Sequence, residues 1–148
     1  MTQRSAMHDT FRIERHFDAA PARVFRAFAD PEAKAKWFGG PLPMKRELFD
    51  FREGGREATE ATLDNGTTFG YTATYTDIVP DERIVYTYEM SMNGQRISVS
   101  VATIELRATA TGTDFAITEQ GVYLDGLDNS AQRKQGTEEL MDALAKTL

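Results

Sequence analysis

The sequence contains no cysteine, only two histidines and a single tryptophan. The absence of cysteine excludes disulfide bonds, thiolate metal sites and a cysteine nucleophile, and it fits a reducing compartment, so we expect a cytoplasmic protein. Because His8 and His16 are the only histidines, a zinc site has no support and we expect no bound metal. We also expect no cofactor, because the chain contains no phosphate-cradling glycine loop or nucleotide fingerprint.

Long apolar runs and basic clusters are also missing. No stretch approaches the roughly 20 apolar residues that a membrane span needs, and residues 1–10 lack the apolar core of a signal peptide, so we expect a soluble protein. The net charge is −6 and the Lys and Arg residues are scattered, which argues against a nucleic-acid partner. With 148 residues, 41% of them hydrophobic, we expect a flexible tail over residues 1–10 and a single domain over residues 11–148.

The order of local patterns predicts an α+β protein. Residues 11–17 alternate like a half-buried strand, and Pro21 and Pro31 each mark the first turn of a short helix, the second capped by Asp30. A long helix with one apolar face is predicted over residues 131–148. Six further strands lie between these helical ends, over residues 45–51, 56–63, 67–79, 83–92, 95–108 and 114–120, joined by turn sequences such as Asn93-Gly94. We expect a curved antiparallel sheet of about six to seven strands wrapped around the C-terminal helix.

Six local markers occur in order along the chain. They are Ala20-Pro21 with Val24-Phe25, Asp30-Pro31 with Trp37-Phe38, the segment 50–55, the segment 78–85, Gly112-Thr113, and Gly136 with Leu140 and Leu144. This series resembles bacterial proteins similar to the C-terminal domain of the activator of a heat-shock chaperone ATPase (AHSA type). These belong to the polyketide-cyclase-like (SRPBCC) group within the START and birch-pollen-allergen superfamily, and the resemblance implies a helix-grip fold.

Aromatic residues gather on two predicted strands. Alternation places Tyr71 and Tyr75 on one face of one strand, and Tyr86, Tyr88 and Met90 on one face of its likely neighbour. If these faces are concave, they form a mostly apolar pocket with sparse hydroxyl groups, which is typical of small-molecule sites. The alternative is that the tyrosines simply pack as core beneath the terminal helix.

Glycine is unusual within a helix, where it costs about 1 kcal/mol relative to alanine. Gly136 lies four residues before Leu140 and therefore faces the sheet, so either the helix approaches the sheet closely there or the missing side chain leaves room for a ligand. Trp37 and Phe38, followed by residues 39–43, could form a rim over the pocket, or Trp37 could merely anchor the second helix. The predicted ligand-binding residues are Trp37, Phe38, Tyr71, Tyr75, Tyr86, Tyr88, Met90, Phe115, Gly136 and Leu140, with Arg52 and Glu119 as polar members of the pocket.

No catalytic residue is predicted. His8 falls in the expected tail and His16 on the polar face of the first strand. The carboxylates of Asp50, Glu57, Glu60 and Glu119 show no partner pattern that would mark an acid/base pair, and those other than Glu119 are expected in solvent.

Three functions therefore remain open. The first is binding of a small apolar or aromatic molecule between the sheet and the terminal helix. The family resemblance implies a second, contact with a chaperone ATPase through the outer face of the sheet or the loop over residues 37–43. The third is a cyclase or hydrolase type of enzyme, which needs a buried ionisable group in the pocket. A homodimer is compatible with the family, although no sequence feature identifies an interface.

Overall fold

The computed structural model describes residues 3–39 and 43–148. Its elements are β1 (Ala6–Phe17), α1 (Pro21–Ala29), α2 (Pro31–Ala35), β2 (Met44–Phe49), β3 (Arg56–Thr62), β4 (Thr68–Val79), β5 (Arg83–Met92), β6 (Gln95–Thr109), β7 (Gly112–Leu124) and α3 (Ser130–Ala145). All strands pair antiparallel in one seven-stranded sheet of order β1-β7-β6-β5-β4-β3-β2. The predicted α+β helix-grip architecture is confirmed.

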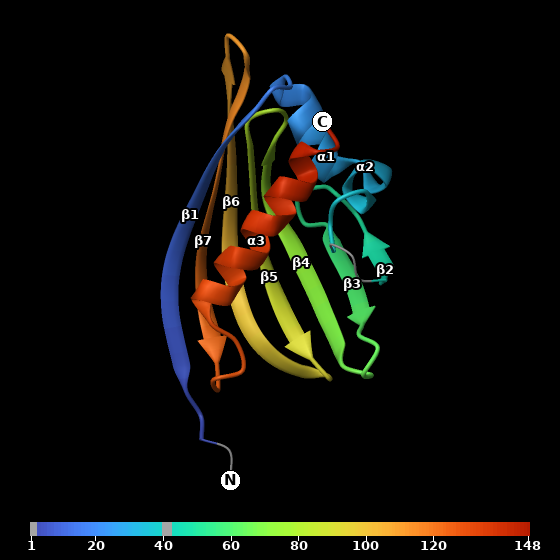
Figure 1. Ribbon diagram of the computed structural model, residues 1–148, viewed down its shortest axis with the longest axis vertical. Coiled ribbons are helices and arrows are strands. Elements are labelled where there is room, and N and C mark those ends of the chain that lie inside the picture. Colours follow the sequence, from blue (N-terminus) through green and yellow to red (C-terminus); the bar gives the residue numbers. More distant parts are fainter. Residues whose placement is uncertain (1–2, 40–42) are drawn as a thin grey trace.

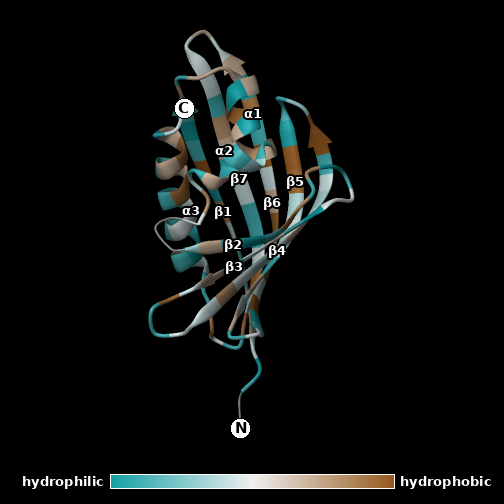
Figure 2. Cartoon of the chain, turned by 90° about the vertical axis from the view of Figure 1, so that its right-hand side faces the viewer, coloured by the Kyte–Doolittle hydropathy of each residue, from teal (hydrophilic) through white to brown (hydrophobic). Residues whose placement is uncertain are grey.

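The sheet is curved, and α3 runs diagonally across its concave face (Figure 1). The short helices α1 and α2 lie at one end of the sheet, beside the C-terminal end of α3 (Figure 1). Seen from the side, β2, β3 and β4 curl across the molecule toward α3 (Figure 2). The space over the concave face is therefore enclosed by α3 and by the curled strands β2, β3 and β4.

Local sequence accounts for the helix starts and for the tightest hairpin. The Asp30 carboxylate accepts a hydrogen bond from the backbone N–H of Glu32 at 3.1 Å, and the Asn129 side chain accepts one from the N–H of Gln132 at 2.9 Å, so both residues act as N-caps. Between β5 and β6, Asn93 and Gly94 have φ angles of 51° and 80°. Two consecutive positive φ angles match the twist of the flanking strands, which explains the tight Asn-Gly hairpin.

Two strands are longer than their sequence patterns predict. β1 begins at Ala6, so residues 6–10 of the expected flexible tail are strand, and β7 continues past Gln120 to Leu124. The two extensions pair with each other, from Ala6 opposite Leu124 to Thr10 opposite Gln120. Each extension forms a strand because it pairs with the other, and neither has an alternating apolar pattern. The sequence of one segment alone therefore does not predict either extension.

The main core lies at the end of the sheet that α1 covers. Phe115 is 2% exposed, and its ring lies 5.3 Å from that of Phe17 and 6.0 Å from that of Phe28. On the α3 side, Met141 and Leu144 complete this cluster. The other half of the concave face is not filled in the same way, and it carries the candidate site.

Candidate functional site

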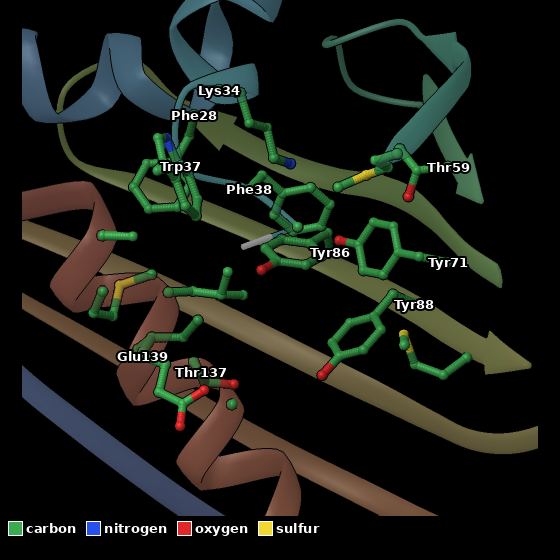
Figure 3. A pocket seen from close by; sticks show the side chains of 18 of the residues that line it. Phe28, Lys34, Trp37, Phe38, Thr59, Tyr71, Tyr86, Tyr88, Thr137 and Glu139 are labelled. Atoms are coloured by element: carbon green, nitrogen blue, oxygen red, sulfur yellow. The ribbon is translucent and has the colours of Figure 1, made fainter. Parts of the chain in front are cut away.

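A cavity of about 760 Å³ lies between the concave face of the sheet and α3. This volume is within the range of small-molecule sites, about 300 to 1,000 Å³. Side chains from all three helices and from every strand except β1 line it, and most of them are apolar or aromatic. Figure 3 shows several of them converging on one space from the sheet and the helix.

Four of the five tyrosines lie together along one wall. Tyr71 and Tyr75 come from β4, and Tyr86 and Tyr88 from β5, as strand alternation predicts, and all four line the cavity. The Tyr71 ring lies 5.0 Å from that of Phe38 and 5.2 Å from that of Tyr88. The wall is thus a continuous aromatic surface, suited to packing against a flat apolar molecule.

The four hydroxyl groups are not equivalent. Tyr75 donates a hydrogen bond to the Glu57 carboxylate at 2.5 Å, and Tyr88 donates one to the Glu119 carboxylate. The hydroxyls of Tyr71 and Tyr86 make no hydrogen bond with any residue in the described ranges. Burial raises the pKa of both phenols well above the ordinary value, so both keep their protons and can donate. They point into the space between the sheet and α3 (Figure 3).

A buried polar network lies near the start of α3. Glu119 on β7 is 3% exposed and accepts a short hydrogen bond from Tyr88. Arg133 on α3 donates to the Tyr88 hydroxyl at 3.1 Å and to Ser98 Oγ at 3.1 Å, and it pairs with Asp128. Burial raises the pKa of the Glu119 carboxyl, although the Tyr88 hydrogen bond and the Arg133 charge oppose that rise. The prediction that Glu119 is a polar member of the pocket agrees with its place in the cavity wall.

A second buried ionic pair lies at the α2 end of the cavity. Lys34 Nζ lies 2.6 Å from Glu57 Oε1, and the two side chains are 6% and 0% exposed. Burial lowers the pKa of Lys34, and the negative charge of Glu57 opposes this. The expectation that Glu57 lies in solvent is therefore wrong. Its strand, β3, carries polar residues on both faces, so alternation gives no signal for it.

Gly136 on α3 faces the cavity. A Cβ atom built at this position meets no atom within 4 Å, so the interpretation that helix and sheet touch closely here is wrong. The glycine instead leaves open space in the cavity wall, and Met90 and Leu140 line the same cavity.

Trp37 both anchors the helices and lines the cavity. It is 4% exposed, and its Nε1 donates to the backbone carbonyl of Ala27 at 3.0 Å, which ties the end of α2 to α1. Phe38 lies beneath the Lys34 amine, 4.5 Å from Nζ to the ring centre. Of the segment predicted to form a rim, residues 40–42 lie outside the described residues.

Two predicted site residues lie elsewhere. Phe115 is on the same face of β7 as Glu119, but Phe28 of α1 covers it, so it belongs to the core and does not line the cavity. The Arg52 side chain is 66% exposed and pairs with Asp50 at 2.9 Å on the outside of the protein. Neither residue is placed to contact a molecule in the cavity.

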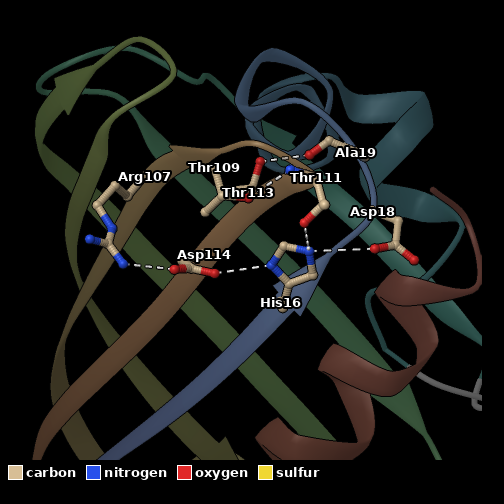
Figure 4. Close-up of polar contacts among 8 residues, drawn as sticks. All are labelled: His16, Asp18, Ala19, Arg107, Thr109, Thr111, Thr113 and Asp114. Atoms are coloured by element: carbon tan, nitrogen blue, oxygen red, sulfur yellow. Dashed lines mark hydrogen bonds and ion pairs between the residues drawn. The ribbon is translucent and has the colours of Figure 1, made fainter.

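A third polar cluster lies outside the cavity, where the β6–β7 hairpin meets the end of β1 (Figure 4). Thr111 Oγ1 lies 3.0 Å from His16 Nε2, and Asp114 Oδ1 lies 3.0 Å from His16 Nδ1. This order of groups resembles a hydroxyl–imidazole–carboxylate triad. Asp18 also lies 3.4 Å from Nε2, however, and Thr111 is on an exposed turn, so we interpret the cluster as a connection between β1 and the hairpin.

Neither a metal site nor a membrane helix is found in residues 3–39 and 43–148. Within these ranges no group of three His, Asp or Glu side chains could hold a metal ion. None of the helices there is both long and apolar enough to cross a membrane.

Solved structures of bacterial proteins share this architecture along almost the whole chain. An uncharacterized protein from Rhizobium leguminosarum is 44% identical, with a TM-score of 0.91 and coverage of 99% of this chain and 97% of the other. The Mll3558 protein from Rhizobium loti is 40% identical, with a TM-score of 0.88 and coverage of 97% and 99%. The AHSA1-like protein from Aeromonas hydrophila shares the fold at 19% identity, with a TM-score of 0.70 and coverage of 94% and 91%.

The family comparison agrees with these structures. A search of curated proteins found no match to this chain. The model of the family described as activator of Hsp90 ATPase homolog 1-like protein (AHSA1) matches residues 18–148, from the end of β1 through α3. The chain belongs to the AHSA1 family, in the helix-grip (SRPBCC) fold.

Proposed function

We propose that this protein binds a neutral, largely aromatic molecule in the cavity between the sheet and α3. The observation that carries the proposal is the pair of hydroxyls on Tyr71 and Tyr86, which line a mainly apolar cavity and have no hydrogen-bond partner among residues 3–39 and 43–148. Both hydroxyls are half-buried and keep a donor proton, so an acceptor oxygen on a ligand can take a hydrogen bond from them.

The charges around the cavity favour an uncharged ligand. Lys34 is balanced by Glu57, and Arg133 is balanced by Asp128, each within an ion pair. An anionic ligand would enter this site without a free cation to pair with it, and burying an unpaired charge is costly. The remaining carboxyl, Glu119, has a pKa raised by burial, which disfavours the charged form that a cationic ligand would need. The expected ligand is therefore a neutral molecule with a flat apolar body and a carbonyl or similar acceptor.

A matched pair of probes tests this proposal. 2-Tetralone and tetralin are bicyclic molecules of nearly equal shape, and only the first carries a carbonyl. We expect calorimetric titration to show binding of both, with 2-tetralone bound up to about tenfold more tightly, because one net hydrogen bond contributes about 0.5 to 1.5 kcal/mol. Failure of both probes to bind contradicts the proposal.

Position 136 provides the control for the location. At Gly136 an added Cβ atom meets no atom within 4 Å, so Gly136→Leu directs its side chain into the cavity, whereas Gln135→Leu adds the same side chain at the neighbouring exposed position of α3. We expect the first variant to weaken binding of both probes at least tenfold and the second to leave it unchanged. Equal effects of the two variants would place the probes elsewhere.

Family membership supports a second function, contact with a chaperone ATPase, because the family takes its description from an activator of Hsp90 ATPase. Trp37 is buried and does not itself offer a contact, so a contact of this kind would use the outer face of the sheet or other residues of the segment 37–43. Added protein should then raise the ATPase rate of a purified Hsp90-type chaperone, and an unchanged rate contradicts this function. A homodimer and a cytoplasmic location remain predictions, the latter because a chain without cysteine fits a reducing compartment.

A further inference from the structure

Glu119 is an ionisable group buried in the wall of an apolar cavity. It is 3% exposed, and only its Oε1 atom accepts a hydrogen bond, from Tyr88. The other oxygen, Oε2, has no hydrogen-bond partner among residues 3–39 and 43–148. Carboxyls are rarely buried without an ion-pair partner, because burial of the charged form is costly. A carboxyl with one fixed oxygen and one unpartnered oxygen in a cavity wall is suited to exchanging a proton with a bound molecule.

The register of the sheet places a phenol in the same row as this carboxyl. Tyr86 on β5 is opposite Ala102 on β6, and Ala102 is opposite Glu119 on β7. Alternation directs the side chains of the row to one face, and two strand spacings separate Tyr86 from Glu119 by roughly 10 Å along the sheet. Ala102 is fully buried between them, and Tyr86 and Glu119 both line the cavity.

The electrostatic coupling between the two groups agrees with this geometry. Burial is the main cause that raises the pKa of Tyr86, and the negative charge of Glu119 is the next. Burial also raises the pKa of Glu119 above that of an ordinary carboxyl, which makes the group a stronger base when it is ionised. The charged and titratable groups around Glu119 are Tyr88 and Tyr86 from β5, Tyr123 from its own strand β7, and Arg133 from α3, with Asp128 paired to Arg133.

We propose that the cavity enolises a neutral ketone, with Glu119 as the group that transfers the proton and Tyr86 as the donor to the oxygen that becomes negative. This inference rests on the proposed binding function and adds a reaction to it. A carboxyl and a phenolic hydroxyl lie in one row beneath a cavity that would hold the ketone.

The reaction needs no further reactant. Oε2 of the ionised Glu119 takes a proton from the carbon next to the carbonyl. The electron pair of the broken C–H bond forms a C=C bond, and the carbonyl π pair moves to the oxygen. The Tyr86 hydroxyl, and the free Tyr71 hydroxyl beside it, donate hydrogen bonds to this enolate oxygen. Glu119 then returns the proton to the same carbon or to a conjugated one, so the outcome is hydrogen exchange or isomerisation.

Hydrogen exchange tests the inference directly. We would incubate 2-tetralone with the protein in D₂O and follow the loss of its α-proton signals by NMR. The wild-type protein should accelerate exchange at least tenfold above buffer. Glu119→Gln should bind 2-tetralone within about threefold of wild type and lose the acceleration, and Tyr86→Phe should lower it about tenfold or more. Glu60→Gln, on an exposed position of β3, is the control and should exchange like wild type.

The outcomes separate this inference from the binding proposal. If 2-tetralone binds and the wild-type protein does not accelerate exchange, enolisation is wrong while binding stands. If Glu119→Gln keeps the acceleration, Glu119 is not the proton-transfer group. If neither 2-tetralone nor tetralin binds, the binding proposal itself fails. A folded state of Glu119→Gln is confirmed by its circular dichroism and its retained binding of tetralin.

Discussion

Lys34 and Glu57 form an ion pair inside the protein, with Nζ and Oε1 2.6 Å apart. The Tyr75 hydroxyl donates to the same carboxylate oxygen, while the other oxygen, Oε2, is buried and has no hydrogen-bond partner in the part of the chain that the structure describes. Lys34 is therefore the cation that neutralises a fully buried carboxylate. The pair also joins α2 to β3 and thereby fixes the wall of the cavity that Trp37 and Phe38 provide.

Loss of Lys34 should strongly destabilise the protein. Lys34→Met keeps most of the side-chain volume but leaves the charge of Glu57 unpaired, which costs about 3 to 5 kcal/mol. Urea denaturation followed by circular dichroism measures this as a lower free energy of unfolding. The double variant Lys34→Met with Glu57→Gln should recover part of the loss, because no buried charge remains.

An exposed ion pair of the same length is the control for Lys34. Arg83 Nε lies 2.6 Å from Asp77 Oδ2, with side chains 50% and 35% exposed. Arg83→Met should cost less than about 1 kcal/mol, because water screens an exposed pair. A cost for Lys34→Met no larger than this would show that the buried pair does not hold the fold.

Gly136→Ala should stabilise the protein. The added Cβ atom meets no atom within 4 Å, and alanine is favoured over glycine inside a helix by about 0.8 to 1 kcal/mol. The midpoint of urea denaturation should therefore rise. Gly121→Ala gives the contrasting result, because its Cβ would lie 3.0 Å from Ser100 Oγ and from the Tyr123 hydroxyl, so this variant should be less stable than wild type. A destabilised Gly136→Ala would mean that α3 lies closer to the sheet than the structure places it.

The free hydroxyls should determine the preference for a carbonyl ligand. Tyr71→Phe and Tyr86→Phe remove one donor each and keep the aromatic wall, so affinity for tetralin should stay within about twofold of wild type. Affinity for 2-tetralone should fall by about 0.5 to 1.5 kcal/mol in the variant whose hydroxyl contacts the carbonyl. Calorimetric titration of both probes measures the difference. Unchanged 2-tetralone affinity in both variants would remove these hydroxyls from the recognition of the ligand.

The tyrosine wall could be predicted from sequence because it depends on a local rule. Alternation along β4 and β5 alone puts Tyr71, Tyr75, Tyr86 and Tyr88 on one face, and the hairpin between the strands sets their register. The same rule correctly places Phe115 on the concave face. It does not reveal that Phe28 covers Phe115, since the position of α1 over the sheet depends on contacts between distant segments.

The buried ionic groups could not be predicted for the same reason. Lys34 and Glu57 are 23 residues apart, and each looks like an ordinary surface residue in its own segment. Arg133 meets Tyr88 across 45 residues of sequence, from a helix whose rotation the sequence does not specify. Burial of these charges follows from the tertiary arrangement. The sequence suggests Glu119 as a polar member of the pocket, but its contact with Tyr88 and the position of Arg133 are seen only in the structure.

The raised pKa of Glu119 predicts a specific dependence of stability on pH. In the interval above the ordinary value of 4.5, the folded protein keeps the Glu119 proton while the unfolded chain has lost it. Stability that Glu119 contributes is therefore lost as the pH rises from this value through the pKa of the folded state. Other carboxyls, such as Asp114 and Asp125, have lowered pKa values and act in the opposite direction, but they are common to wild type and Glu119→Gln.

The free energy of unfolding of wild type minus that of Glu119→Gln should thus fall between pH 4.5 and pH 8 by about 1.4 kcal/mol for each unit by which folding raises the pKa of Glu119. Urea denaturation of both proteins across this range measures the difference, and a difference that stays constant or increases would show that Glu119 is ionised in the folded protein throughout.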